Sequence, residues 1–254
     1  MGQDPTEVLA VIPARWGSTR FPGKPVAMLA GEPMIAHVVR RALAARRVDR
    51  VLVATDDERI AAAAEAAGAE PVLTGECASG TDRVAQAVLG REGWRLVVNL
   101  QGDEPLLAGE NVDALIDGML ARPEVEMATL CRPLGAERVE EPNAVKVVRD
   151  GGGMALYFSR SVIPHPRERD TAAALWRLHL GVYGFRRRGL ERFVALAPSE
   201  LELAEGLEQL RALEHGLGIL VLDAPRDAFG VDTAEDLVRA EERLALEARD
   251  EPAG

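Results

Sequence analysis

The sequence predicts an α/β fold: a mostly parallel sheet with helices on both faces and a smaller, partly antiparallel lobe inserted into it. The chain has 254 residues, 47% of them hydrophobic, which is enough for one sizeable core. Over residues 8–73, short apolar runs alternate with amphipathic helical patterns, as in successive βαβ units. From 142 to about 185 this alternation gives way to closely spaced strand patterns. We therefore expect a single α/β domain over 1–254, with the inserted lobe at about 142–185.

Four short apolar runs predict the parallel strands of the first half, at 8–12, 51–54, 70–73 and 96–100. Pro13 is expected to end the first strand, because proline lacks the backbone donor that a ladder needs. Apolar residues spaced along one face predict helices at 34–45 and 110–121. The residues Thr55-Asp56-Asp57 can cap a third helix, which Gly68 would close.

The second half predicts a different arrangement, with strand patterns at 128–130, 142–148, 154–160, 179–185 and 219–222. The run Asp150-Gly151-Gly152-Gly153 lies between the second and third of these and indicates a hairpin rather than a crossover helix. We expect a loop at 163–172, a solvated turn at 186–188, and helices at 202–215 and from 234 to about 248. The lobe is therefore predicted to be partly antiparallel.

Composition excludes several classes of function. The formal net charge of −11 argues against nucleic acid or an anionic membrane as a partner, because no broad basic face is expected. Cys77 and Cys131 form neither a disulfide framework nor a C-x-x-C motif, so two free thiols in a reducing compartment are the simplest interpretation. No apolar run approaches a membrane span, and the N-terminus lacks the regions of a signal peptide. We expect a cytoplasmic protein.

The segment 13–24 has the features of a phosphate-binding loop. It follows the first predicted strand and contains Arg15, Gly17, Gly23 and Lys24. Glycines allow backbone N–H groups to approach phosphate oxygens, and fixed cations balance the phosphate charge. The spacing is neither that of a P-loop nor GxGxxG, which argues against a Rossmann dehydrogenase. The alternative is a surface loop that is merely basic.

Two further motifs combine a chemical interpretation with a structural one. Asp103, in Gln101-Gly102-Asp103-Glu104-Pro105, follows a buried strand at the edge where open α/β sheets bind ligands. Its carboxylate can ligate Mg²⁺ while phosphate oxygens fill other positions, or it can bond nearby backbone in a turn. The run Ser79-Gly80-Thr81-Asp82-Arg83 reads as a helix N-terminus capped by its first or third residue.

The pattern P-A-R-x-x-S-T-R-x-P-G-K at 13–24 resembles the signature loop of the nucleotide-sugar nucleotidyltransferases, and above all of the branch that activates 3-deoxy-manno-octulosonate (Kdo). Other matching motifs are S-G-T-D-R at 79–83, Q-G-D-E-P at 101–105 and G-V-D-T at 230–233, so the resemblance covers about 8–244. It implies the reaction CTP + Kdo → CMP-Kdo + pyrophosphate, in support of lipopolysaccharide synthesis. The anomeric hydroxyl would attack the α-phosphorus, without a covalent enzyme intermediate. A homodimer is also expected from the resemblance.

The resemblance further implies roles for individual residues. Those expected to bind the nucleotide are Ala14, Arg15, Lys24, Ser79, Arg83 and Gln101. Those expected around the sugar acid are Gln101, Asn143, Lys146, Arg160, His179, Glu208 and Gln209. The expected catalytic residues are Arg15, Lys24, Asp103 and Asp232, the two aspartates holding Mg²⁺ as cofactor. The sequence departs from the family at Cys77, where a histidine is expected, and at Leu178, where a basic residue is expected and Arg177 stands one position earlier.

Several alternatives remain open. A lone histidine such as His179 is more often structural than functional, and Glu208 and Gln209 lie on what reads as an ordinary charged helix face. Asp232 precedes Thr233 and Asp236, a capping-box pattern that structure alone can explain. The enzyme could also activate another acidic sugar, such as 8-amino-Kdo or sialic acid. The alternative from a different class is a non-catalytic nucleotide-binding module.

Overall fold

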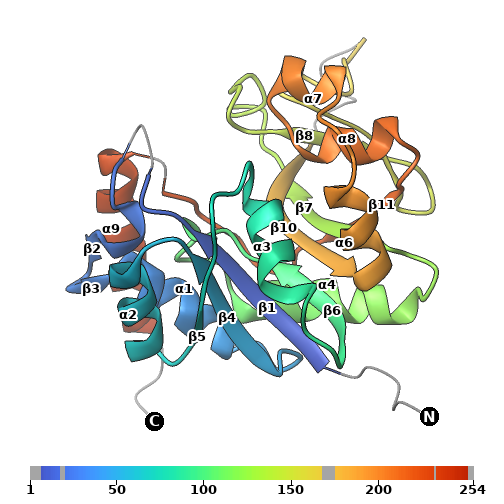
Figure 1. Cartoon of the computed structure of the whole chain (residues 1–254). Coiled ribbons are helices and arrows are strands. Elements are labelled where there is room, and N and C mark those ends of the chain that lie inside the picture. Colours follow the sequence, from blue (N-terminus) through green and yellow to red (C-terminus); the bar gives the residue numbers. More distant parts are fainter. Residues whose placement is uncertain (1–6, 18–20, 168–174, 232, 251–254) are drawn as a thin grey trace. The chain divides into compact units, whose positions relative to one another are not determined.

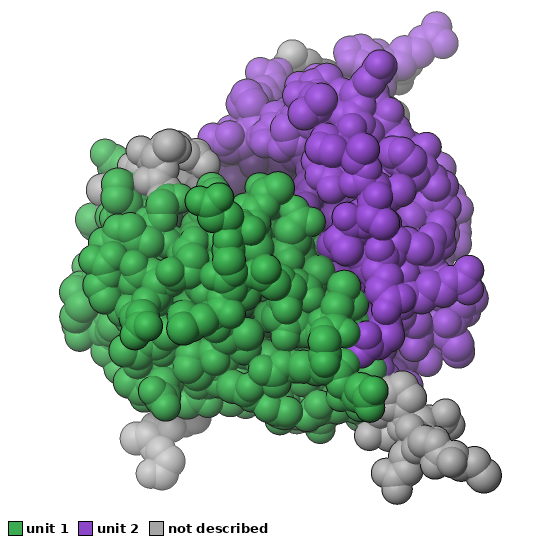
Figure 2. Space-filling view, viewed as in Figure 1, with its two compact units in different colours: residues 1–94, 98–113, 226–254 green, residues 95–97, 114–225 purple. Residues whose placement is uncertain are grey.

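The computed structural model describes residues 7–17, 21–167, 175–231 and 233–250 (Figure 1). The chain divides into two compact units, shown in different colours in Figure 2. The first unit comprises residues 1–94, 98–113 and 226–254, and the second comprises 95–97 and 114–225. The lobe expected at 142–185 falls inside the second unit, which is wider. The division passes through strand β6 (Trp94–Asn99) and helix α4 (Gly109–Ala121).

The main sheet contains the strand order β6-β1-β4-β5, with β1 at Glu7–Ala14, β4 at Arg50–Thr55 and β5 at Glu70–Leu73 in the first unit. β4 pairs in parallel with both β1 and β5. The helices are α1 (Met34–Leu43), α2 (Glu58–Ala66) and α3 (Gly80–Val88). Helices α1 and α2 connect β1 to β4 and β4 to β5, whereas α3 connects β5 back to β6 at the other end of this order. Because these crossovers are right-handed, α3 lies on the opposite face of the sheet from α1 and α2 (Figure 1). The predicted α/β fold is confirmed.

The first strand runs further than expected. Pro13 was predicted to end it, but β1 continues to Ala14, and Pro13 lies opposite Ala54 in the parallel ladder. Proline removes only its own donor, while its carbonyl and the next residue's N–H remain available. The strand therefore extends to the edge of the loop that carries Arg15.

A short hairpin after the loop was not predicted. Lys24–Val26 forms the 3-10 turn η1, followed by β2 (Met28–Leu29) and β3 (Glu32–Pro33). Leu29 and Met34 pack in one cluster with Leu106, Val231 and Ala240, the last of these on helix α9 (Ala234–Asp250). The end of the chain thus packs beside its beginning, within the first unit.

The second unit has strand order β11-β7-β10, with β8 paired to β10 and β9. Its strands are β7 (Met127–Pro133), β8 (Lys146–Arg149), β9 (Ala155–Ser159), β10 (Arg177–Arg186) and β11 (Ile219–Asp223). β11 and β7 are parallel, whereas the pairings of β10 with β7 and β8, and of β8 with β9, are antiparallel. The predicted hairpin is confirmed, and the lobe is partly antiparallel as expected.

Two predictions about helices in this unit were wrong. The segment 202–215 is not one helix but α7 (Glu200–Glu205) and α8 (Gln209–Glu214), because Gly206 adopts the left-handed conformation with φ 61°. The turn at 186–188 is the start of α6 (Arg187–Val194), which buries Leu190 and Phe193. Their spacing of three residues is a helical signal that the arginine run obscured. Among the described helices, none is long and apolar enough to cross a membrane.

Candidate active site

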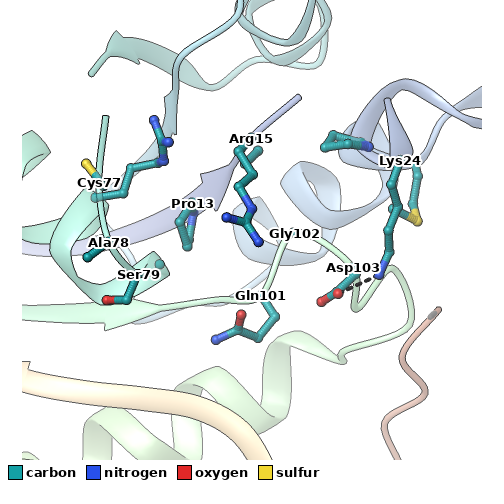
Figure 3. A pocket seen from close by; sticks show the side chains of 14 residues that line it. Pro13, Arg15, Lys24, Cys77, Ala78, Ser79, Gln101, Gly102 and Asp103 are labelled. Carbon is teal, nitrogen blue, oxygen red and sulfur yellow. Dashed lines mark hydrogen bonds and ion pairs between the residues drawn. The ribbon is translucent and has the colours of Figure 1, made fainter. Parts of the chain in front are cut away.

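A pocket of about 300 Å³ lies where the loops after β1 and β6 meet the N-terminus of α3, all in the first unit (Figure 3). Every residue predicted to bind the nucleotide lines it, together with Asp103. Arg15 is exposed and extends into the pocket, between the side of Ser79 and that of Lys24 and Asp103 (Figure 3). The structure therefore brings together side chains from three separate motifs.

Lys24 and Asp103 form an ion pair in this pocket. The ammonium of Lys24 donates to Oδ2 of Asp103 at 2.6 Å, and the two side chains are 11% and 39% exposed. Gly102 makes this approach possible, because a Cβ there would lie 3.0 Å from the carbonyl oxygen of Pro13. The loop after β6 thus lies directly against the end of β1, so that the cation of one loop reaches the carboxylate of the other.

On the α3 side of the pocket, the polar side chains already have partners. The hydroxyl of Ser79 accepts a hydrogen bond from the backbone N–H of Asp82 at 3.1 Å and caps α3, which confirms the predicted helix N-terminus. Arg83 is buried and donates to Asp56 Oδ2 at 2.8 Å and to the carbonyl of Gly75 at 3.4 Å. Both residues line the pocket while also organising its wall.

Cys77, at the departure from the family pattern, also lines the pocket. Burial raises the pKa of its thiol, so the side chain is a neutral group at neutral pH rather than a thiolate. Cys131 lies buried in β7, where burial raises the pKa of its thiol to about 11. Both cysteines are free, as expected.

Asp232 lies outside the described residues, whereas Val231 and Thr233 on either side of it are described. The backbone N–H of Val231 donates to the carbonyl of Asp103 at 2.8 Å. The helix cap that follows is made by Thr233 and Asp236, since each backbone N–H donates to the other's side chain, at 3.1 and 3.2 Å. The predicted capping box is confirmed, and the segment leading into it is bonded to the backbone of Asp103.

The described lining of the pocket contains one carboxylate, that of Asp103, that could contribute to a divalent-metal site. Among the described residues, no group of three or more His, Cys, Asp or Glu side chains could hold a metal by itself. Asp103 nevertheless presents a part-exposed carboxylate to the pocket. Mg²⁺ commonly binds one or two carboxylates and takes its other ligands from phosphates and water. The donor chemistry of this carboxylate therefore fits Mg²⁺, and Lys24 is the cation that pairs with it in the structure.

Of the residues predicted around the sugar acid, Gln101 lines the pocket and the others lie in the second unit. Lys146 is fully buried, and its ammonium donates to the carbonyls of Glu141, at 3.0 Å, and Arg160. Burial lowers the pKa of Lys146. Arg160 in turn donates to the carbonyls of Glu205 at 2.7 Å and Pro142 at 3.0 Å. These cations fasten the hairpin to the segments around it.

His179 is part of an aromatic and hydroxyl cluster. Its Nε2 lies 3.0 Å from the hydroxyl of Thr129, and its ring stands edge-on to Phe158 with centroids 4.9 Å apart. That hydroxyl also lies 2.7 Å from the carbonyl of Val182, which can only accept. Burial lowers the pKa of His179 to about 3, so the ring is neutral. Because the hydroxyl of Thr129 donates its proton to the carbonyl of Val182, it accepts a hydrogen bond from the N–H of Nε2. The other ring nitrogen, Nδ1, is then unprotonated and can accept a hydrogen bond.

The remaining three predicted residues differ in accessibility. Asn143 is exposed, and Glu208 stands at the N-terminus of α8. Gln209 is only 4% exposed, yet its amide nitrogen Nε2 has no hydrogen-bond partner among the described residues. A buried donor without a partner is costly, and such groups often mark the position of a bound polar molecule.

Sequence reasoning missed Asp56, which binds both Arg83 and the backbone N–H of Trp16. Asp56 follows β4 as Asp103 follows β6. That shared position, just past a parallel strand, was the available signal, but the residue was interpreted only as part of a helix cap.

The chain is similar to known cytidylyltransferases over almost its whole length. A family model for cytidylyltransferases matches residues 9–220. A 3-deoxy-manno-octulosonate cytidylyltransferase of Anaeromyxobacter sp. (strain Fw109-5) is 55% identical over 96% of this chain and 99% of its own length. The protein of the same name from Myxococcus xanthus (strain DK1622) is 49% identical over 92% of this chain and 94% of its own length.

Solved structures agree with this. The structure of a CMP:2-keto-3-deoxy-manno-octonic acid synthetase complexed with CTP matches with a TM-score of 0.90 and 41% identity, covering 95% of this chain and 99% of that one. A 4-diphosphocytidyl-2C-methyl-D-erythritol synthase from Anaerococcus prevotii shares the fold, with a TM-score of 0.65 and 13% identity. The chain belongs to the cytidylyltransferase family of nucleotidyltransferases.

Proposed function

We propose that this protein transfers the cytidylyl group of CTP to Kdo, giving CMP-Kdo and pyrophosphate, and so activates Kdo for lipopolysaccharide synthesis. The observation that carries the proposal is the pocket, in which Arg15, Lys24 and Asp103 share one cavity with the capped N-terminus of α3. Full-length relatives that bear this activity in their name support the choice of substrates. As part of the same proposal, the enzyme is a cytoplasmic homodimer.

Arg15 and Lys24 bind the triphosphate in this proposal. A triphosphate competes with Asp103 for the ammonium of Lys24, because both present anionic oxygens to the same cation. As Lys24 turns to the phosphates, the carboxylate of Asp103 is released. Asp103 and Asp232 would then hold Mg²⁺, which supplies charge neutralisation on the phosphates and polarises the reacting centre.

The nucleotide base and ribose lie against Ala14, Ser79 and Arg83 in this proposal, since these residues also line the pocket. Three further residues would contact the sugar acid. Gln101 would do so from the pocket itself, and Gln209 would use the amide nitrogen that lacks a protein partner. His179 would accept a hydrogen bond from a sugar hydroxyl at Nδ1.

The remaining residues assigned to the sugar acid are Asn143, Lys146, Arg160 and Glu208. Lys146 and Arg160 act through the backbone that they hold, because their side chains are bonded to carbonyls. The reaction then needs positioning and charge stabilisation rather than an enzyme nucleophile.

The test is pyrophosphate release measured over a grid of nucleoside triphosphates and acidic sugars. CTP with Kdo is expected to be the preferred pair, since a pocket that hydrogen-bonds specific polar groups discriminates strongly against analogues that lack them. Equal turnover with UTP or ATP would overturn the choice of nucleotide. Faster turnover of 8-amino-Kdo or sialic acid would overturn the choice of sugar, and binding of CTP without any turnover would favour a non-catalytic module.

A further inference from the structure

Trp16 lies at the base of the cation loop, by which we mean residues 15–24, whose described part consists of 15–17 and 21–24. Its backbone N–H donates to Oδ1 of Asp56 at 3.2 Å. The guanidinium of Arg59 lies over its indole ring, 3.2 Å from the ring centroid. Asp56 directly precedes the N-cap of α2, and Arg59 lies in its first turn. The first unit therefore grips the start of the loop through both backbone and side chain.

The far end of the cation loop returns to the same tryptophan. The backbone N–H of Gly23 donates to the carbonyl of Trp16 at 3.1 Å. Gly23 has φ 70°, and a Cβ there would lie 3.0 Å from an indole carbon. The ring thus packs against the glycine backbone. Arg15 directly precedes Trp16 and Lys24 directly follows Gly23, so both cations of the pocket are anchored at one point.

Asp56 also connects this anchor to the opposite wall of the pocket. Its second oxygen, Oδ2, accepts from Arg83 at 2.8 Å, and the side chain of Arg83 is 5% exposed. Asp56 is not among the described residues that line the pocket. Its carboxylate therefore bridges the cation loop and α3 without lining the pocket. A neighbouring carboxylate also orients Arg59, because Asp57 accepts hydrogen bonds from its Nε at 2.9 Å and from its Nη2 at 2.6 Å.

We propose that Asp56 and Arg59 are positioning residues for the nucleotide: they hold Trp16, and through it they set where Arg15 and Lys24 stand relative to the triphosphate. This inference rests on the proposed function. A cation above an aromatic face is attracted by the ring, and small displacements of groups that contact a reacting phosphate lower the rate steeply. The loss of either residue should therefore weaken nucleotide binding even though neither contacts the substrate.

The test uses Asp56→Asn and Arg59→Met in the full-length protein. Asparagine cannot accept from Trp16 and Arg83 with both of its atoms, and methionine fills space without a charge. Calorimetry with CTP is expected to show about tenfold weaker binding in each variant, as for the loss of a charge-assisted contact. KM for CTP should rise in parallel while KM for Kdo stays within about twofold, since the sugar acid is not held by these groups.

Two further variants sharpen the comparison. Arg59→Lys keeps a cation above Trp16 and should restore most of the CTP affinity that Arg59→Met loses. Arg91→Met is the matched control, because Arg91 also pairs with a carboxylate, that of Glu70 at 2.6 Å, in the same unit but outside the described pocket lining. It should leave CTP affinity unchanged. The emission of Trp16, taken as wild type minus Trp16→Phe, should change in Arg59→Met and not in Arg91→Met.

Wild-type CTP affinity in Arg59→Met would overturn the inference, as would equal losses in Arg59→Met and Arg91→Met. A rise in KM for both substrates together would indicate a merely structural role and would also overturn it. Arg59 is 61% exposed, so this variant carries the test even if Asp56→Asn does not fold. If wild-type protein fails to bind CTP, the proposed function fails first. The same variants are then compared with the triphosphate that the wild type does bind.

Discussion

At the scale of single residues, the contact between Lys24 and Asp103 joins two roles that are usually considered apart. Lys24 is proposed to bind phosphate and Asp103 to bind metal, yet the two side chains bind each other at 2.6 Å. A free metal ion therefore competes with an ammonium for the carboxylate, whose Oδ2 the ammonium binds. Nucleotide that draws Lys24 away removes this competition, so the metal should bind together with the nucleotide rather than before it.

Lys24→Met tests this directly. Turnover with CTP should fall by about a hundredfold or more, because a charged group at the reacting phosphates is lost. Binding of Mn²⁺ without nucleotide, followed by electron paramagnetic resonance, should instead become tighter than in the wild type, since the competing cation is gone. Unchanged or weaker Mn²⁺ binding would mean that the ion pair does not guard the carboxylate. Arg91→Met again serves as the control.

His179 gives a prediction about pH. Burial lowers its pKa to about 3, below an unfolded value near 6.5, so between these values the unfolded chain binds a proton that the folded protein does not. Its contribution to stability is therefore fully present above pH 6.5 and is lost as the pH falls towards 3. In His179→Gln, the melting temperature should depend less on pH between 7.5 and 5 than in the wild type. Parallel curves for the two proteins would show that the ring titrates normally.

At the scale of elements, the start of α9 separates capping from catalysis. The cap is made by Thr233 and Asp236, whereas the role proposed for Asp232 is that of a metal ligand. Thr233→Ala should lower the free energy of unfolding by about 1 kcal/mol and keep most activity. Asp232→Asn should keep the melting temperature and lose most activity, as should Asp103→Asn. The double variant of the two aspartates should be little worse than either alone, because residues that act as one unit are not additive.

Kinetics with a magnesium titration, together with thermal melts on the same preparations, distinguish a metal-binding role of Asp232 from a helix-capping role. An active Asp232→Asn protein with unchanged magnesium dependence would remove Asp232 from the proposed site. A destabilised but active Asp232→Asn protein would instead assign it to the helix start.

At the scale of the whole molecule, the two units share a strand and a helix. The division passes through β6 and α4, and neither element can be half formed without losing its own hydrogen bonds. Urea unfolding should therefore be a single transition, with coincident curves from circular dichroism and from tryptophan emission. Trp16 and Trp94 report on the first unit and Trp176 on the second. CTP with Mg²⁺ should move the whole transition to higher urea. The prediction would be contradicted if urea unfolding took place in two separate steps in both the wild type and Trp176→Phe.

The sequence predicted the fold from local patterns, whereas the residues expected in the pocket came from the resemblance of its motifs to a known family. Each apolar run marks a strand, and parallel strands bring the ends that follow them to one edge of the sheet. What it could not predict were contacts between such ends. The pair Lys24 and Asp103 is 79 positions apart, and the bridge through Asp56 spans 40 positions to Trp16. Gly206 likewise ends α7 within a segment of apolar helical periodicity, since the left-handed backbone of one glycine does not alter that periodicity.

The bond from Val231 to the carbonyl of Asp103 has a consequence for synthesis of the protein. Every described residue that lines the pocket has left the ribosome once residue 103 has, yet more than half of the chain is still to come. Until Val231 and Ala240 arrive, the carbonyl of Asp103 lacks this donor and Leu29 lacks the cover of α9. The nascent chain therefore carries the pocket's residues long before it carries their support, so activity appears only when translation is almost finished.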